Sequence, residues 1–403
     1  MNNKMYKELK VMVLIVIAVA FVGILFSLVQ FSGAKKDIEV KNEMKVIAGQ
    51  SYEGYMIDEE DHYNVYRMMP VVRGIYVSGN MAGYRINPYI DLANKTEINS
   101  FVIDVKDDNG RLSFKTDDET LKSYGVNERL SIRNIHSVMD KLRENGVYPI
   151  ARVVAFKDDT IKDSKSEWML KYKSGEFFKT REPGGSKTTW MNPYNRETWD
   201  YIVKMAKEAG KVGFKEIQFD YVRFHEQTRG KDIAYGFDSA EKSKTEIIAE
   251  FIEYAKEELH KERLFVAADV FGAIMTSKVD AATIGQDYDM VTDHVDAICP
   301  MVYPSHYAKG SFGIKKHPDL EPYRTIAGAM DASKSIIGGK PGKAVVRPWI
   351  QGFTAKYIGV GNYRVYGKEE IRAQIRAIYD AGYSEWLIWN PSNRYNADHY
   401  LKN

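Results

Sequence analysis

The chain has 403 residues, of which 57 are Lys or Arg and 55 are Asp or Glu, so its formal net charge is only +2. This balance predicts no concentrated basic surface of the kind that nucleic acid requires, and we expect no nucleic-acid partner. The single cysteine, Cys299, excludes an intrachain disulfide and a multi-cysteine metal site, and 44% hydrophobic residues are typical of a globular protein.

Residues 11–31 form an apolar segment without a charged side chain. As a helix rising about 1.5 Å per residue, this segment would span about 30 Å, the thickness of bilayer hydrocarbon. A short tail before a first membrane helix normally stays inside. We therefore expect a cytoplasmic tail (1–10), a single-pass transmembrane anchor (11–31) in the cell membrane and an extracytoplasmic remainder. The alternative is a cleaved signal peptide on a secreted protein.

Residues 32–70 are polar and charged without a sustained apolar period, which favours a stalk or linker. From position 71 onward, short apolar runs of β type alternate with helical patterns. The eight runs cover 71–78, 100–107, 148–156, 216–224, 263–271, 296–304, 343–351 and 384–392. The clearest helical patterns cover 131–146, 196–210, 239–259 and 368–382, and three of them end in glycines that we expect to stop the helix, Gly146, Gly210 and Gly382.

Strands that alternate with helices pair in parallel, because a parallel connection needs a crossover. Eight such units predict an α/β protein, a (β/α)8 TIM barrel over residues 71–403. No G-x-G-x-x-G motif opens a helix after any of the runs, so a dinucleotide-binding sheet has no support.

In a barrel of this kind, the active site lies at the carboxyl ends of the strands. The residues at these ends are mostly polar or aromatic. In chain order they are Tyr76, Ser78, Asp104, Lys106, Arg152, Asp220, Arg223, Asp269, Tyr303, His306, Gln351, Trp389 and Asn390.

Asp220 is the most informative of these residues. In the run Q-F-D-Y-V-R-F, a period of two puts Gln218, Asp220 and Val222 on one face. A buried carboxylate needs a partner or a wet pocket, and Arg223 is a candidate partner. Asp220 is thus either a nucleophile or base, or half of a structural Asp–Arg pair.

Asp269, in V-A-A-D-V-F, would bring a second carboxyl beside the first from the next strand. Two neighbouring carboxyls separate each other's pKa values, which suits one to act as an acid and the other as a base or nucleophile. We interpret Asp104 and Lys106, in F-V-I-D-V-K, as a supporting ion pair that faces the barrel interior.

Other signals concern binding and the core. Trp168 and Trp190, in the loop 157–195, and Trp389 could stack on sugar rings, although packing explains each of them equally well. Cys299 is expected in the core. No spacing of His or Cys residues forms a metal motif, so we expect no metal and no other cofactor.

Five segments carry a resemblance to a known family: V-R-G-I-Y-V-S, F-V-I-D-V-K-D-D-N-G, F-D-Y-V-R-F, C-P-M-V-Y-P-S-H-Y and W-L-I-W-N-P-S-N-R-Y. From about Val71 to Tyr395 the chain resembles a bacterial "putative glycosyl hydrolase" barrel family of unassigned function, grouped with alpha-amylase-like barrels. The resemblance implies that Asp220 is the nucleophile of strand 4. Where such barrels usually carry a glutamic acid on strand 5, this chain has Asp269, which leaves Glu226 as a reserve candidate for the acid.

The function we expect is hydrolysis of an extracellular or cell-wall polysaccharide by paired carboxylates with a retaining outcome, Asp220 acting as nucleophile or base and Asp269 as acid. The other residues named at the strand ends, Ser78 apart, would bind the polysaccharide or oligosaccharide substrate. One alternative is a non-catalytic barrel that binds glycans or serves as an envelope scaffold, and another is a metal-dependent hydrolase.

Overall fold

The computed structural model describes residues 56–57, 67–181 and 185–402. The predicted tail, the predicted anchor at 11–31 and most of the predicted stalk lie outside these residues. Among the described residues, no helix is both long enough and apolar enough to cross a membrane. Where the end of the predicted stalk is described, β1 (Met56–Ile57) pairs antiparallel with β2 (Arg67–Met68), and Met69 is buried among side chains of the barrel interior.

The eight predicted runs all contain strands of one parallel sheet, which confirms the (β/α)8 barrel. The strands are β3 (Arg73–Val77), β4 (Ser100–Lys106), β5 (Tyr148–Val154), β6 (Glu216–Asp220), β7 (Phe265–Phe271), β8 (Ala297–Met301), β9 (Val345–Val346), β10 (Trp349–Gln351) and β11 (Trp386–Trp389). They follow the order β10-β11-β3-β4-β5-β6-β7-β8-β9.

The seventh run is split into β9 and β10 by Arg347 and Pro348. Proline has no backbone N–H to donate to a neighbouring strand, so an interruption at this position is expected. Beyond the interruption, Trp349 pairs with Met301, which joins β10, at one end of the strand order, to β8, which lies next to the other end. The sheet therefore closes into a ring.

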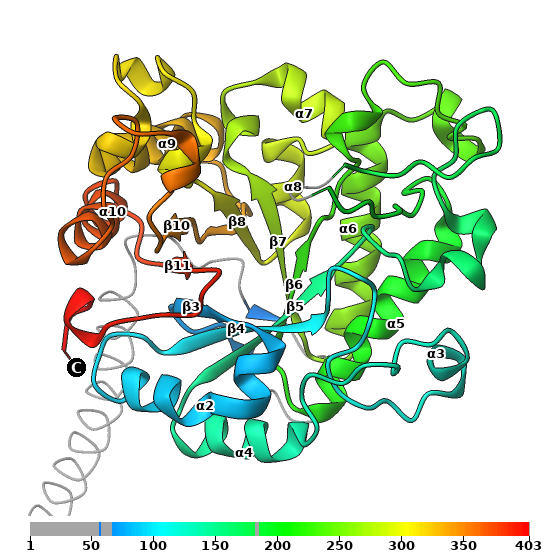
Figure 1. The fold of residues 1–403 in the computed structure, drawn as a ribbon, viewed down its shortest axis with the longest axis horizontal. Coiled ribbons are helices and arrows are strands. Elements are labelled where there is room, and N and C mark those ends of the chain that lie inside the picture. The colour runs from blue at the N-terminus through cyan, green and yellow to red at the C-terminus, as the bar shows by residue number, and fades with distance from the viewer. Residues whose placement is uncertain (1–55, 58–66, 182–184, 403) are drawn as a thin grey trace, which may run out of the picture. The chain divides into compact units, whose positions relative to one another are not determined.

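The α-helices of the barrel lie around the strands, on the outside of the ring (Figure 1). Their bounds are α2 (Gly79–Ala93), α3 (Glu119–Ser123), α4 (Ile135–Glu144), α5 (Arg196–Val212), α6 (Lys244–His260), α7 (Lys278–Ile284), α8 (Tyr288–His294), α9 (Pro322–Ile337) and α10 (Lys368–Asp380). Ser78, at the end of the first predicted run, is the N-cap of α2, and its side chain accepts a hydrogen bond from the Met81 amide.

Two of the three predicted glycine stops are confirmed, because Gly146 and Gly382 follow α4 and α10 with φ of 66° and 86°. The third prediction was wrong, because Gly210 lies inside α5. This helix ends at Val212 and is capped by Gly213, which has φ of 113°. A Cβ atom at position 210 would come within 2.8 Å of Leu264 Cδ1. Glycine at this position therefore permits close packing inside the helix.

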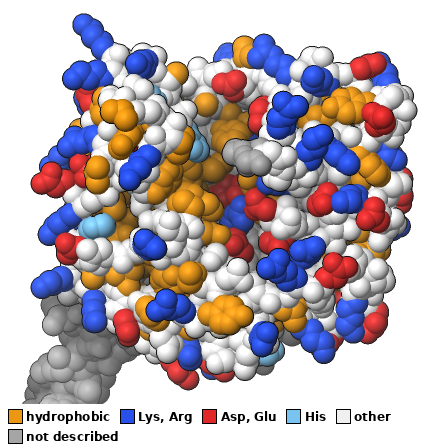
Figure 2. All heavy atoms as spheres, viewed as in Figure 1, with side chains coloured by type: hydrophobic (Ala, Val, Ile, Leu, Met, Phe, Trp, Pro, Cys, Tyr) orange, Lys and Arg blue, Asp and Glu red, His pale blue; other side chains and the backbone are white. Residues whose placement is uncertain are grey.

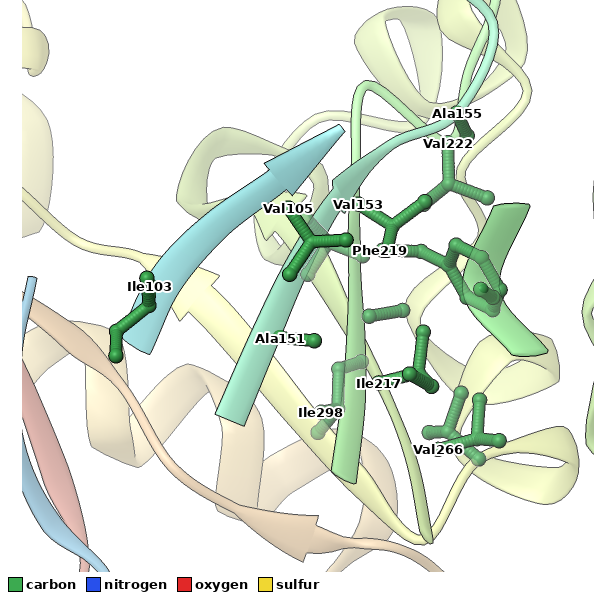
Figure 3. Close-up of a cluster of buried hydrophobic side chains, with 14 of the residues drawn as sticks. Ile103, Val105, Ala151, Val153, Ala155, Ile217, Phe219, Val222, Val266 and Ile298 are labelled. Carbon is green, nitrogen blue, oxygen red and sulfur yellow. The ribbon is translucent and has the colours of Figure 1, made fainter. Parts of the chain in front are cut away.

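Two layers of apolar side chains follow from the alternation along the strands. The outer layer fills the space between strands and helices and includes Ile103, Val153 and Phe219 (Figure 3). The inner layer includes Val102, Ile150 and Cys299, which is fully buried, as predicted for a core cysteine.

A sealed ion cluster lies at the amino-terminal side of the ring. The Arg347 guanidinium donates to Glu216, the first residue of β6, and to Glu385, just before β11, with Nε to Glu385 Oε2 at 2.6 Å. All three side chains are 0% exposed. Burial raises the pKa of both glutamates, and the arginine charge opposes this rise. This end of the barrel is closed to solvent.

Candidate active site

A cavity of about 490 Å³ opens at the carboxyl ends of the strands. Figure 2 shows it as a hollow in the middle of the face, with acidic and basic side chains at its bottom. Nine of the twelve residues predicted from the strand ends line it: Tyr76, Asp104, Arg152, Asp220, Arg223, Asp269, Tyr303, His306 and Trp389.

Arg152, on β5, is the centre of the charged groups. Its Nε and Nη2 atoms donate to Asp220 Oδ2 at 2.9 and 2.7 Å, and its Nη1 atom donates to Asp104 Oδ1 at 2.8 Å. Nη2 also donates to Asp108 Oδ1 at 3.1 Å. One guanidinium thus holds three carboxylates, on β4, on the loop after β4 and on β6, in a fixed arrangement.

This arrangement corrects two predicted pairs. Arg223 is not the partner of Asp220, since its Nη1 atom donates to Glu226 Oε2 at 2.9 Å. Lys106 is not paired with Asp104, because its Nζ lies 2.8 Å from Asp158 Oδ2, and both side chains are fully buried. A register shift between β4 and β5 explains the second error, since it separates residues 104 and 106, interrupts the strand alternation and lets the two side chains point to different surroundings.

The backbone turns sharply directly after Asp220. Tyr221 has φ of +50°, a conformation that costs energy for a residue with a side chain. The turn lets the Tyr221 amide donate to Asp220 Oδ1 at 2.7 Å and brings the Tyr221 ring to the wall of the cavity. The turn also ends β6, so Val222 packs in the outer layer. The prediction that Val222 lies on the same face as Asp220 was therefore wrong.

Asp269, on β7, is in a different environment from Asp220. Its side chain is almost fully buried, and its Oδ1 atom accepts hydrogen bonds from Gln218 Nε2 at 2.5 Å and Trp349 Nε1 at 2.6 Å. Burial, and then the nearby charge of Asp220, raise the pKa of Asp269 well above its usual value. Its Oδ2 atom accepts no hydrogen bond from a described residue.

Asp104 and Tyr76 extend the network along the wall. The Tyr76 hydroxyl donates to Asp104 Oδ2 at 2.6 Å. Burial raises the pKa of Asp104, although Arg152 and the Tyr76 hydrogen bond act against the rise. Burial and the neighbouring Asp104 charge raise the pKa of Tyr76, which keeps its hydroxyl protonated as a donor.

Aromatic rings form much of the remaining wall. The rings of Tyr76 and Trp389 lie 4.1 Å apart between centroids, and those of Trp349 and Trp389 lie 6.0 Å apart, nearly perpendicular. Across the cavity, Tyr303 and His306 meet edge to face at 5.0 Å. Burial lowers the pKa of His306, which favours a neutral imidazole. Such walls can contact the apolar faces of sugar rings.

Several predicted contacts lie away from the cavity. Lys106, Gln351 and Asn390 are not among its lining residues. Gln351 is fully buried and donates to Asp319, and Asn390 donates to the Gly352 and Arg394 carbonyls, so both support loops. Trp168 and Trp190 are packed in the outer core and do not line the cavity.

Glu226, the reserve candidate for the acid, also lies off the cavity lining. Its side chain is 52% exposed and pairs with Arg223. Partial burial raises the pKa of Glu226, but the charges of Arg223 and His225 outweigh this and lower it. A lowered pKa does not suit a group that must donate a proton at neutral pH.

Sequence reasoning missed seven lining residues: Asp107, Asp108, Asn109, Tyr221, Phe271, Met301 and Trp349. The polar run D-D-N-G directly after β4 was a usable signal for the first three. Trp349 lies on the interrupted seventh strand, where the facing could not be counted from a period of two. Among the described residues, no group of three or more His, Cys, Asp or Glu side chains is placed to hold a metal ion.

Comparisons with known proteins agree with this fold. The glycoside hydrolase domain of PgaB (BpsB) from Bordetella bronchiseptica is similar over 82% of this chain and 97% of that one, with 13% identity and a TM-score of 0.57. Alpha-L-fucosidase isoenzyme 2 from Paenibacillus thiaminolyticus is similar over 82% and 48%, with 13% identity and a TM-score of 0.51. Both show a common fold alone.

A hypothetical protein from Ruminiclostridium thermocellum ATCC 27405 is 35% identical over 49% of this chain and 97% of its own, with a TM-score of 0.43. No curated protein sequence matches the chain. The family described as "Putative glycosyl hydrolase domain" matches residues 74–395, from the first barrel strand to the loop after the last. The chain therefore belongs to this glycosyl hydrolase-like family.

Proposed function

We propose that the protein is a glycoside hydrolase that cleaves an extracellular or cell-wall polysaccharide with Asp220 and Asp269. One observation carries the proposal: two neighbouring carboxyls open on one cavity in opposite environments. Asp220 is held by a guanidinium, whereas Asp269 is buried with a raised pKa. Glycosidases need such a pair, one carboxyl as an acid and one as a nucleophile or base.

Asp269 is suited to be the acid. Its raised pKa favours the protonated form, and its Oδ1 atom is occupied by the Gln218 and Trp349 donors. The proton is then expected on Oδ2, which can donate it to the glycosidic oxygen of the substrate. As the leaving sugar departs, Asp269 becomes a carboxylate that the same two donors stabilise.

Asp220 is suited to be the nucleophile or base. The Arg152 guanidinium and the Tyr221 amide fix its orientation through three hydrogen bonds, so no reorganisation is needed when it approaches the sugar. The negative charge of Asp220, together with that of Asp108 beside it, also stabilises the positive charge that develops on the sugar ring. Trp389, Trp349 and Tyr76 would contact the sugar face.

The full chain should be incubated with a panel of bacterial and plant polysaccharides, and new reducing ends should be measured. The D220N variant, whose amide keeps the shape of the carboxyl, is the matched control. Hydrolysis by the wild type and none by D220N supports the proposal; equal hydrolysis by both contradicts it. Binding without cleavage would instead favour the non-catalytic glycan-binding barrel.

The anomeric form of the first product distinguishes the two routes. Retention requires a covalent intermediate on Asp220, and inversion requires a water molecule activated by it. We propose retention. Trapping of an intermediate with an activated fluorosugar would support this choice, and a product of inverted configuration would contradict it.

Placement of the barrel outside the cell, on an uncleaved anchor at residues 11–31, is part of the same proposal and rests on the apolar segment. Protease added to intact cells should then digest the barrel. In untreated cells, the whole chain should be recovered in the membrane fraction. Protection from protease would contradict this placement, and recovery of the chain in the medium would indicate a cleaved signal.

A further inference from the structure

A second cavity, of about 750 Å³, lies beside the active site on the loops that follow β5 and β6. Among the described residues, its charged lining residues are all cations, namely Lys179, Arg181, Lys187, Arg229 and Lys231. No Asp or Glu is among its described lining residues. We call this surface the basic groove.

The charges of the basic groove are not neutralised by the described residues around it. None of the five cations forms an ion pair with a described residue, and all five are exposed. Two acids of the same loops have other partners: Asp232 pairs with Lys173 at 2.7 Å, and Glu226 pairs with Arg223 at 2.9 Å. The whole chain has a net charge of only +2, so the positive charge of the basic groove is a local feature of this surface.

Another surface cavity of the same molecule shows that this is not a general property of its hollows. The cavity between α5 and α6 contains one cation, Arg196, among four acids, Asp200, Glu250, Glu253 and Glu257. Arg196 is paired there with Glu250 at 2.8 Å. The basic groove differs in this respect from the cavity between α5 and α6.

A wall of packed aromatic rings lies between the basic groove and the active-site cavity. Tyr221, which lines the active-site cavity, packs on Trp190 at 5.7 Å between centroids, and Trp190 packs on His225 at 4.9 Å. His225 in turn meets Phe178 of the basic groove at 6.0 Å. Figure 2 shows Lys and Arg side chains on the same face as the central hollow, over these loops.

The wall is also tied together by hydrogen bonds. The side chain of Gln227 accepts a hydrogen bond from the Arg181 amide at 2.9 Å and donates one to the Arg181 carbonyl at 3.0 Å. Gln227 follows the cavity residue Arg223 by four positions. These bonds join the loop after β6 to the loop after β5. A polymer that leaves the active-site cavity over this wall therefore meets a preformed surface.

We propose that the basic groove binds anionic groups, carboxylate or phosphodiester, that are repeated along the polysaccharide whose cleaved bond lies in the active-site cavity. This inference rests on the proposed function and specifies its substrate as an acidic polysaccharide. Exposed Lys and Arg side chains bind both kinds of anion, and the aromatic residues Tyr172 and Phe177 in the same groove offer apolar contact to sugar rings.

The test measures binding without turnover, so it does not depend on hydrolysis. Full chain carrying D220N, in detergent, is titrated at low salt with four polymers of similar length: a polyuronate, a poly(glycerol phosphate), neutral dextran and single-stranded DNA. The groove variant adds K179E, R229E and K231E. The matched control adds K309E, K315E and K316E, which reverse three exposed lysines on the loop after β8.

We expect at least one anionic polymer to bind about tenfold more tightly than dextran, and the groove variant to lose about tenfold in affinity. The control should change less than about twofold, and binding should weaken as salt is raised. Which anionic polymer binds identifies the anion. Equal affinity of the groove variant and its parent, equal affinity for dextran, or tighter binding of single-stranded DNA would each overturn the inference.

This result and that of the hydrolysis assay are separable. If no anionic polymer binds more tightly than dextran while the wild type still hydrolyses its substrate, only the proposed role of the basic groove is rejected. Intact, groove-dependent binding with no difference in hydrolysis between the wild type and D220N would reject the proposed catalytic pair alone.

Discussion

The two ends of this barrel are built from the same chemical parts and differ in their access to solvent. At one end, Arg347 lies between Glu216 and Glu385, with all three side chains 0% exposed. At the other, Arg152 lies between Asp104, Asp108 and Asp220, and Asp108 is 43% exposed. An arginine among carboxylates is therefore no indication of function by itself. What distinguishes the second cluster is the cavity on which it opens.

The largest expected effect separates the two ends directly. D220N should reduce hydrolysis about 10⁴-fold or more, since an amide can neither attack the sugar nor activate water. Its melting temperature should stay close to that of the wild type, because the amide fits the same space. Steady-state rates on the substrate found in the panel, with thermal unfolding in parallel, measure both. A large loss of stability would instead make Asp220 a structural residue.

At the sealed end, the expectation is reversed. R347M should lower the free energy of unfolding by about 3–5 kcal/mol, because it leaves two carboxyls buried without a counter-charge. Activity at low temperature should be retained. Chemical denaturation measures the loss.

The pH dependence of R347M sharpens this comparison. A carboxyl with a raised pKa in the folded state destabilises the protein as pH rises from its unfolded pKa through its folded one. The deficit of R347M should therefore be smaller at pH 5 than at pH 8, because the cost of burying charge on Glu216 and Glu385 grows as pH rises. A deficit independent of pH would show that lost packing, and not charge, is its cause.

D269N should have a smaller effect, about 10²-fold on substrates with a poor leaving group. An aryl glycoside with a good leaving group should be cleaved nearly as fast as by the wild type, since it needs no protonation. The wild-type activity should fall as pH rises through the raised pKa of Asp269, and this alkaline limb should be missing in D269N. The pH profile of kcat/KM provides the measurement, and an unchanged limb would reassign the acid.

The smallest effect is expected at Glu226. E226Q should change kcat/KM less than about threefold, because this side chain is half exposed and off the cavity lining. The same rate assay measures it, with D269N as the internal reference. A loss as large as that of D269N would restore Glu226 as the acid.

Most of the fold could be predicted from the sequence because the signals are repeated. Eight β-type runs alternate with helical patterns, and each run contains an observed strand. The errors occur where a single backbone angle overrides the pattern. Tyr221, with φ of +50°, ended β6 early and moved Val222 to the outer layer, and Gly213 took over the role expected of Gly210.

The site was predictable in its members but not in its contacts. A count along a strand gives the facing of a side chain, so Asp104, Arg152, Asp220 and Asp269 were found. Which charge meets which depends on the distance between strands that are far apart in sequence. Arg223 is near Asp220 in sequence, yet Arg152, 68 residues away, is the group that binds it. The basic groove was missed for a related reason, since its cations come from two loops and the net charge conceals them.

The closing seam of the ring has a consequence for the acid. β10 is joined to β8 by the pair Trp349–Met301, with Val302 N donating to Trp349 O at 3.0 Å beside it, and β9 adds two further pairs with β8. The Trp349–Met301 pair is the last one of this seam, and the end of a ladder opens locally before its middle does, so the amide protons beside it should exchange early. The indole of the same Trp349 donates to Asp269. Local opening of the seam would therefore remove one of the two donors that stabilise the Asp269 carboxylate. The proton affinity of the acid is thereby coupled to the closure of the barrel.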